Sequence, residues 1–353
     1  MKSLSLVSND TFEISTKKLN SLSMGSCRIR ISFTGICSSD VERGLDNGAY
    51  FYPLVMGHEI AGHVVEQSDD VQGDWVGKPV SVFPLKPCFQ CSYCLEKKYM
   101  RCSNYDYYGS RCDGGFSDYL DVNAWNLIEI PSSVEMIDAC LTEPCAVVNH
   151  ALSRFDQATI KKPGCRIGII GSGFLGLIAS DLIRIKNPTG QITLIDRNQF
   201  KLSLGQMADT KIKLSNDNDR YNFEEAYRDY FDIILEATGT VSSIHSSLAC
   251  IKPGGSIVLM GNMKDGLVLN QKTLDSIIRN EITISGTWNS DFKNGKVNDW
   301  AKIMKLYENG FCPSKYVTDE VDLKNIPRIL RERLQHKRGE KISSVIKAVY
   351  KNV

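Results

Sequence analysis

The segment 86–102, KPCFQCSYCLEKKYMRC, holds four cysteines at short spacing. Cys88, Cys91 and Cys94 are three residues apart, and Cys102 follows. Four thiolates satisfy a tetrahedral structural zinc site, which leaves no open coordination position. Because two-residue gaps let a tight turn aim successive sulfurs at one point, this spacing favours a metal site over free cysteines scattered by chance. We therefore predict a structural zinc that performs no chemistry.

Three other segments carry residue types that zinc accepts together. Cys37 lies in GICSSD, His58 and Glu59 lie in GHEIAG, and Glu143 lies in TEPCAV. Each also has an ordinary structural explanation: Cys37 and His58 as buried core residues, and Glu59 as a surface charge. Glu143 could simply complement a helix dipole. Composition and spacing alone therefore do not establish a second metal site.

Residues 165–176, CRIGIIGSGFLG, place a glycine pattern between a short apolar strand and a helix. This strand–turn–helix setting is typical of dinucleotide binding. Gly171 would make the turn, Gly173 would let the backbone approach a pyrophosphate, and Gly176 would let the helix pack on the strand. Phe174 and Leu175 begin the helix, whose N-terminus would face the phosphates.

The next strand, QITLID, ends at Asp196, twenty residues after Gly176. An acid at this point can accept both ribose hydroxyls of NAD and repels the 2′-phosphate of NADP. Arg197 could favour NADP, but Asp196 is expected at the strand tip, which indicates NAD. The alternative is that Asp196 is only a turn residue at a strand end. Thr238 is expected to line the same crevice.

Apolar strands recur after the glycine pattern, at 231–239, 255–262 and 281–289. Strands that alternate with helices in this way predict a parallel, doubly wound α/β sheet. The first residues, MKSLSLVSNDTFEIS, alternate like a strand.

Length and composition limit the functional classes. A chain of 353 residues is expected to form two domains. Hydrophobic residues make up 42% and charged residues 24%, as in soluble globular proteins, and the net charge of +1 gives no electrostatic reason to expect nucleic acid or membrane as partner. With neither a signal-peptide pattern nor an apolar stretch of roughly 20 residues, the chain is expected to be cytoplasmic, with reduced thiols.

Together these motifs resemble the zinc-containing medium-chain alcohol and polyol dehydrogenases over nearly the whole chain. GICSSD, GHEIAG, the four-cysteine segment, TEPCAV, GSGFLG and Asp196 occur in the family's order. The resemblance implies a GroES-like, mostly-β catalytic domain formed by residues 1–144 and 286–353, with a structural zinc lobe at 86–103. A Rossmann NAD-binding domain, 145–285, would be inserted in it, with the active site in the cleft between them.

The resemblance also implies NAD and two zinc ions per chain, one catalytic and one structural. Cys37, His58 and Glu143 would bind the catalytic zinc, and Glu59 would be a direct ligand or lie just behind them. Ser39 would relay the substrate proton, although from its residue type alone it is more simply a turn residue. The family is commonly dimeric or tetrameric, and residues 266–270, GLVLN, suggest an exposed strand that could pair with its twin.

Three segments, at 47–59, 84–94 and 105–119, are similar to the sugar-alcohol phosphate dehydrogenases of this family. The implied reaction is hydride transfer between NAD and a secondary alcohol of a small molecule such as galactitol 1-phosphate. Guanidinium groups suit a phosphate, which makes Arg43 and Arg111 candidates. Both are equally compatible with surface ion pairs to Asp40 or Asp113.

Other functions remain open at this point. The substrate could be an unphosphorylated polyol, threonine or another small alcohol, or it could be a pentitol phosphate or a ketose phosphate. These differ only in pocket residues. A non-catalytic zinc- and NAD-binding protein is disfavoured, because every expected ligand residue and Ser39 are present.

Overall fold

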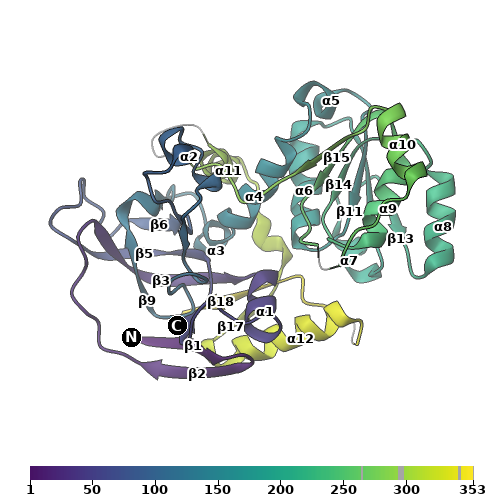
Figure 1. Ribbon diagram of the computed structural model, residues 1–353. Coiled ribbons are helices and arrows are strands. Elements are labelled where there is room, and N and C mark those ends of the chain that lie inside the picture. The colour runs from purple at the N-terminus through teal and green to yellow at the C-terminus, as the bar shows by residue number, and fades with distance from the viewer. Residues whose placement is uncertain (264, 293–297, 341–342, 353) are drawn as a thin grey trace. The chain divides into compact units, whose positions relative to one another are not determined.

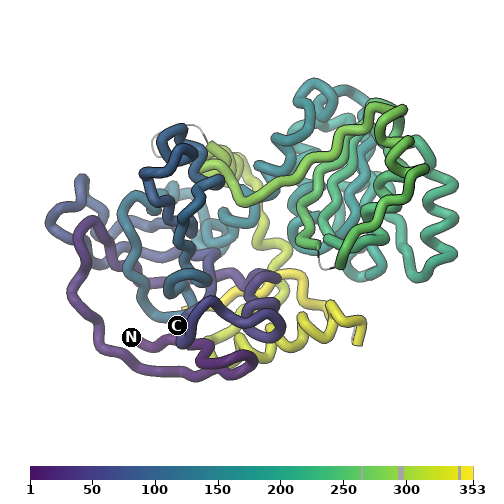
Figure 2. The backbone as a smooth tube through the Cα atoms, viewed as in Figure 1, coloured from purple at the N-terminus to yellow at the C-terminus, as the bar shows by residue number. Residues whose placement is uncertain are grey.

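The computed structural model describes residues 1–263, 265–292, 298–340 and 343–352. The chain forms two compact units, Met1–Ala146 with Ser290–Val353, and Val147–Asn289. Both ends of the chain, purple and yellow in Figure 2, therefore belong to the first unit. Within the described residues no helix is long and apolar enough to cross a membrane.

The first unit is built around a seven-stranded sheet. Its strands follow the order β10, β6, β5, β3, β18 and β17, and β9 also pairs with β3. Because β18 pairs with β3, the last residues of the chain complete a sheet that begins near the N-terminus (Figure 1). Its strands are β3 (Ser26–Ile36), β5 (Glu59–Gln67), β6 (Pro79–Val82), β9 (Tyr119–Asn123), β10 (Leu127–Glu129), β17 (Val317–Val321) and β18 (Lys347–Lys351).

The core of this unit forms from apolar positions on the sheet, including Ile29 and Ile31 of β3 and Val80 and Val82 of β6. Their spacing of two places them on one face of each strand. The other strands and helices of this unit are β1 (Lys2–Ser8), β2 (Thr11–Thr16), β4 (Leu54–Val55), β7 (Leu85–Lys86), β8 (Asp106–Tyr107), α1 (Ser38–Leu45), α2 (Ser92–Leu95), α3 (Met136–Cys140), α11 (Asp299–Glu308) and α12 (Ile326–Arg338). Helix α12 packs against α1, and the Lys337 ammonium lies 2.9 Å from the Glu42 carboxylate.

The second unit contains a six-stranded sheet in the order β13, β12, β11, β14, β15, β16, and every pair is parallel. The order reverses between β11 and β14, and in such sheets ligands bind beyond the carboxyl ends of the strands at this point. The strands are β11 (Arg166–Ile170), β12 (Gln191–Asp196), β13 (Thr210–Lys213), β14 (Phe231–Glu236), β15 (Ile251–Leu259) and β16 (Thr283–Gly286). The doubly wound parallel sheet expected from the sequence is confirmed.

Helices connect these strands. Helix α6 packs against β11 and β12, whereas α9 packs against β14 and β15. The helices are α4 (Thr142–Leu152), α5 (Gln157–Lys161), α6 (Phe174–Lys186), α7 (Gln199–Leu204), α8 (Asp217–Ala226), α9 (Val241–Cys250) and α10 (Gln271–Arg279). Helix α4 crosses the division between the two units.

One sequence expectation differs from the structure. Residues 266–270 form no strand with any described part of the single chain, although their alternation suggested one. The side chain of Val268 is 78% exposed. The expected pairing was with a second copy of the chain, and that expectation stays a prediction.

Candidate metal centres and cofactor site

The four cysteines of the 86–103 lobe come together. The sulfur atoms of Cys88, Cys91, Cys94 and Cys102 all lie within 4.8 Å of one another. All four are free thiols, and the backbone N–H of Cys88 donates to the Cys102 sulfur at 3.3 Å. Backbone N–H groups, first that of Ser103, lower the pKa of Cys91 to about 6, which favours the thiolate that a metal needs.

Aromatic rings anchor this lobe to the body of the first unit. Phe89 and Tyr99 of the lobe lie 5.0 and 5.1 Å, centroid to centroid, from the indole of Trp125. Trp125 also packs edge-on against Phe292 at 5.1 Å and Phe83 at 6.1 Å. The fold of the lobe and the environment of Trp125 are therefore physically linked.

A second group of ligand atoms forms from residues far apart in sequence. The donor atoms of Cys37, His58 and Glu59 lie within 4.8 Å of one another. Cys37 immediately precedes α1, and His58 precedes β5, which begins at Glu59. Gly57 has φ of +90°, a conformation that glycine adopts readily, and a Cβ there would lie 2.7 Å from the Phe116 ring. The chain reversal that presents His58 thus requires a glycine.

Buried charges surround this group. The Lys347 ammonium contacts the Glu59 carboxylate at 2.5 and 2.6 Å, and both side chains are buried. A Cβ on Gly35 would lie 1.8 Å from Glu59 Oε2, so the neighbouring strand must carry a glycine there. Asp40 Oδ1 lies 3.6 Å from His58 Nδ1, and its Oδ2 accepts the backbone N–H of Cys37 at 2.9 Å.

These charges control the protonation of His58. Burial lowers its pKa, but the charges of Asp40 and Cys37 outweigh burial and raise it well above the ordinary value. The buried Nδ1 atom forms no hydrogen bond. A thiol, an imidazole and a carboxylate this close together, with an unsatisfied buried nitrogen, are a donor set that fits zinc.

Glu143 is not in the group whose donor atoms all lie within 4.8 Å of one another, but the charges of His58 and Glu59 act on it. It lies at the start of α4, and Tyr107 donates its phenol hydrogen to Glu143 Oε1 at 3.1 Å. Burial raises the pKa of Glu143 to about 7. Sequence reasoning missed Tyr107, because no local pattern distinguishes it from Tyr105 and Tyr108. Ser39 is half-buried in the first turn of α1.

The two candidate arginines have different surroundings. The Arg43 guanidinium lies 3.6 Å from Asp40 Oδ1, with 18% of the side chain exposed. Arg111 is exposed, and its guanidinium lies 4.5 Å from the ring centroid of Tyr50 and 4.6 Å from that of Tyr105. Asp113 instead accepts the backbone N–H of Val55. Arg43 therefore has the ion pair that the sequence left open as an alternative, whereas Arg111 is held by two aromatic faces.

The glycine-rich loop follows β11 as expected. Gly171 has φ of +106°, and a Cβ on Gly176 would lie 1.8 Å from the Gly171 carbonyl oxygen. Gly173 is the N-cap of α6, and nothing lies within 4 Å of its Cβ position. Phe174 is buried and Leu175 is half-buried in the first turn of the helix. The loop therefore offers open backbone at a helix N-terminus, which suits an anion.

Asp196 lies at the end of β12 and braces this loop. Its Oδ2 accepts the backbone N–H of Ser172 at 2.7 Å, and its Oδ1 accepts that of Asn198 at 2.8 Å. Arg197 is exposed beside it. At the end of β14, the exposed Thr238 donates its hydroxyl to the buried carboxylate of Glu236 at 2.5 Å. All of these residues lie at the carboxyl edge of the parallel sheet.

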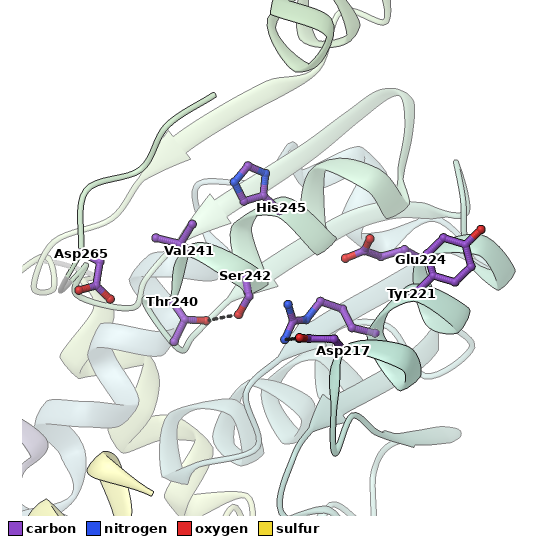
Figure 3. A pocket seen from close by; sticks show the side chains of 9 residues that line it. Asp217, Tyr221, Glu224, Thr240, Val241, Ser242, His245 and Asp265 are labelled. Atoms are coloured by element: carbon purple, nitrogen blue, oxygen red, sulfur yellow. Dashed lines mark hydrogen bonds and ion pairs between the residues drawn. The ribbon is translucent and has the colours of Figure 1, made fainter. Parts of the chain in front are cut away.

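A cavity of about 640 Å³ continues from this edge. It begins at Thr240, whose hydroxyl lies 3.2 Å from that of Thr238, and it extends between α8 and the start of α9 (Figure 3). Its lining residues are Asp217, Arg220, Tyr221, Glu224, Thr240, Val241, Ser242, His245 and Asp265. None of them is a candidate metal ligand, so the cavity belongs with the cofactor edge of the second unit.

Comparisons with known proteins agree with both units. The model of the "Alcohol dehydrogenase GroES-like domain" matches residues 23–132, and that of the "Zinc-binding dehydrogenase" matches residues 175–309. The chain is 29% identical over 282 residues to galactitol 1-phosphate 5-dehydrogenase of Escherichia coli K12, covering 79% of this chain and 80% of that protein. It is 26% identical over 285 residues to a sorbitol dehydrogenase of Halalkalibacterium halodurans, covering 79% of each.

Solved structures show the same fold. The crystal structure of galactitol-1-phosphate dehydrogenase from Escherichia coli matches with a TM-score of 0.87 over 100% of both chains, at 24% identity. The two family models together match most of the chain, in the order in which the sequence motifs occur. The chain therefore belongs to the zinc-binding medium-chain alcohol dehydrogenases, the family that combines a GroES-like domain with a Rossmann domain.

Proposed function

We propose that this dehydrogenase transfers a hydride between NAD and a secondary alcohol of a sugar-alcohol phosphate. The observation that carries the proposal is the group formed by the half-buried Cys37 and the buried His58 and Glu59, whose donor atoms lie within 4.8 Å of one another. Three protein ligands are the number typical of catalytic zinc, which keeps a position open for substrate. The four-cysteine lobe would hold the second, structural zinc.

Cys37, His58 and Glu59 would hold the catalytic zinc, which supplies Lewis-acid chemistry that brings the pKa of an alcohol toward neutrality. The surrounding residues prepare the ligands. Asp40 fixes the loop of Cys37 and lies beside His58, while Lys347 neutralises Glu59. We assign Ser39, half-buried two residues after Cys37, to carry the substrate proton toward solvent.

The second unit would bind NAD. The open backbone at Gly173 would take the pyrophosphate at the N-terminus of α6. Asp196 would accept the ribose hydroxyls, which favours NAD over NADP because a second negative charge there is repelled. The neighbouring Arg197 and Thr238 would contact the cofactor from the same edge, and Phe174, Leu175, Gly171 and Gly176 would shape the loop.

Arg111 supports a phosphorylated substrate. Two tyrosine faces hold its guanidinium while the side chain stays exposed. A guanidinium held this way loses less freedom when it binds a phosphate with two hydrogen bonds. Arg43 lies beside the buried carboxylate of Asp40. The phosphate proposal therefore depends mainly on Arg111.

A second candidate is an unphosphorylated polyol. The chain is 26% identical to a protein named sorbitol dehydrogenase, close to the 29% for the protein named for the phosphorylated substrate. The family's zinc and NAD chemistry is the same for both. The two candidate functions differ only in which residues contact the end of the substrate away from the reacting carbon.

We further propose that two copies associate through β16. This strand is one of the two edges of the parallel sheet, and Ile284 on it is 39% exposed. Two further apolar side chains lie close to β16 along the chain: Ile278 of α10, which is 73% exposed, and Trp288, which is 55% exposed. An open edge strand beside exposed apolar side chains suits pairing with a second copy.

The test is NADH formation by the zinc-loaded protein with galactitol 1-phosphate and with galactitol, each with NAD and with NADP. We expect turnover that requires the phosphate and NAD. Arg111→Ala should raise KM for the phosphorylated substrate about tenfold or more, since a charge-assisted hydrogen bond is lost. The control is Arg331→Ala, whose guanidinium pairs with Asp10 instead. Equal turnover of free galactitol would contradict the phosphate assignment and favour the second candidate.

A further inference from the structure

The turn after β14 closes around a buried carboxylate. Glu236, the last residue of β14, has 0% of its surface exposed. Its Oε1 accepts the backbone N–H of Thr238 at 2.8 Å, the Thr238 hydroxyl at 2.5 Å and the Ser243 hydroxyl at 2.7 Å. The backbone N–H of Gly239 lies 3.1 Å from each carboxylate oxygen. One side chain therefore ties the turn to the first turn of α9.

The backbone of Glu236 ties the same turn to the residues that follow β15. Its carbonyl oxygen accepts the N–H of Met260 at 2.8 Å and that of Gly261 at 3.1 Å. Gly239 has φ of +70°, and a Cβ there would lie 2.1 Å from the Asn262 carbonyl oxygen. The ends of the two strands are thus packed backbone against backbone. While the carboxylate holds it, the turn has little room to move.

This turn also contacts the glycine-rich loop. A Cβ on Gly171 would lie 2.8 Å from Thr238 Cγ2, so the methyl group of Thr238 is next to the loop while its hydroxyl is engaged by Glu236. On the other side, Asp196 accepts the backbone N–H of Ser172 at 2.7 Å. Strands β12 and β14 flank β11 in the sheet. The loop after β11 is therefore braced by a carboxylate from each neighbouring strand, directly by Asp196 and through Thr238 by Glu236.

A second buried carboxylate lies at the opposite end of the same strand. Asp232 accepts the backbone N–H of Arg166 at 2.6 Å and pairs with the ammonium of Lys252. It lies at the amino edge of the sheet, whereas ligands of such sheets bind beyond the carboxyl ends of the strands. Asp232 and Glu236 therefore both stabilise β14, but only Glu236 holds residues of the proposed cofactor site.

We propose that Glu236 is a positioning residue for the cofactor, because its carboxylate fixes Thr238 and Gly239 against the glycine-rich loop. The inference rests on the proposed function and deepens it, since it adds a buried residue to the NAD site. Buried N–H and hydroxyl groups that lose their acceptor cost free energy, so without this carboxylate the turn should rearrange. A loop that is ordered in advance loses less conformational freedom when its ligand binds.

The test is fluorescence titration of the zinc-loaded protein with NADH. Glu236→Asp keeps the charge but withdraws the carboxylate by one methylene from its donors, and it should weaken NADH binding about tenfold or more. KM for NAD should rise with it, while kcat at saturating NAD should change less than about threefold, because the lost contact serves cofactor binding alone.

Two further variants separate positioning from general stability. Glu236→Gln removes the charge but keeps Oε1 as acceptor for Thr238 and Ser243, so NADH affinity should stay within about threefold of the wild type. Asp232→Asn is the matched control on the same strand. It breaks the pair with Lys252 and should lower stability in urea unfolding, but it should leave NADH affinity unchanged.

The two proposals fail in different ways. If the wild type does not bind NADH, the proposed function is wrong and the inference with it. If the wild type binds NADH and Glu236→Asp binds it equally well, only the inference is wrong. Equal losses of NADH affinity in Glu236→Asp and Asp232→Asn would indicate general destabilisation and overturn the inference. A Glu236→Gln variant as weak as Glu236→Asp would overturn it too, because charge rather than the placement of an acceptor would then decide binding.

Discussion

The ammonium of Lys347, in the last strand of the chain, lies 2.5 Å from the carboxylate of Glu59, at the start of β5. Both side chains are buried, and 288 residues separate them. Burying a carboxylate without its counter-ion costs free energy. The proposed metal group, which includes Glu59, therefore depends on the C-terminal strand that carries Lys347.

Replacing Lys347 with Met should therefore destabilise the first unit. Removing one partner of a buried ion pair costs about 3–5 kcal/mol, because the remaining charge is left uncompensated. Urea unfolding of wild type and variant measures the difference. Lys351→Met is the control, since its pair with Glu320 is half-exposed and should contribute less than about 1 kcal/mol. Equal, small losses for both variants would contradict this prediction.

The four-cysteine lobe should lose its metal when one ligand is removed. Cys94→Ser is expected to lower the zinc content by one ion per chain, measured by elemental analysis, while the other zinc remains. Because Phe89 and Tyr99 of the lobe pack on Trp125, the fluorescence of this tryptophan should change as well.

Two controls separate these effects. Cys312→Ser alters an exposed cysteine outside the lobe and should change neither zinc content nor fluorescence. In a Trp125→Phe background, Cys94→Ser should still lose zinc but no longer produce the fluorescence change. An unchanged zinc content in Cys94→Ser would rule out a metal at the four cysteines.

Gly173 and Gly176 should respond differently to alanine. No protein atom lies within 4 Å of the Cβ position of Gly173, so Gly173→Ala should change stability little. The new methyl group should nevertheless hinder a pyrophosphate and weaken NADH binding. Gly176→Ala would place a methyl group against the Gly171 carbonyl and should lower stability by about 1–3 kcal/mol. NADH fluorescence titration and thermal unfolding measure the two effects. Undiminished NADH affinity in Gly173→Ala would contradict the loop's role.

Glu143 should make the stability of the zinc-free protein depend on pH. Burial raises its pKa to about 7 in the folded chain, above its value in the unfolded chain. The folded state therefore binds the proton more tightly, and the resulting stability is present at low pH and lost as pH rises through about 7. Glu143→Gln, which stays neutral, should remove this loss. Urea unfolding of both proteins between pH 5 and pH 8, roughly the window set by the shift, checks it.

Local sequence was sufficient for much of the second unit. Apolar runs between turn residues predicted β11, β12, β14 and β15, because buried parallel strands are apolar on both faces. The edge strand β16 was predicted as well, although it is largely exposed. The glycine pattern was also recognisable, since the positive φ of Gly171 and the close approach at Gly176 restrict which residues can stand there. Asp196 was recognisable by its spacing from this pattern. The segment 266–270 forms no strand within the described part of the single chain, because alternation alone does not supply a pairing partner. Its pairing with a second copy stays a prediction.

By itself, the sequence determined the cysteine lobe and the glycine-rich loop, whose functional residues are neighbours along the chain. Only the tertiary structure decided that Cys37, His58 and Glu59 meet, that Lys347 is their counter-ion, and that Tyr107 holds Glu143. These contacts join residues from different strands and helices. Their meeting depends on strand order and packing of the whole first unit, which no short stretch of sequence encodes.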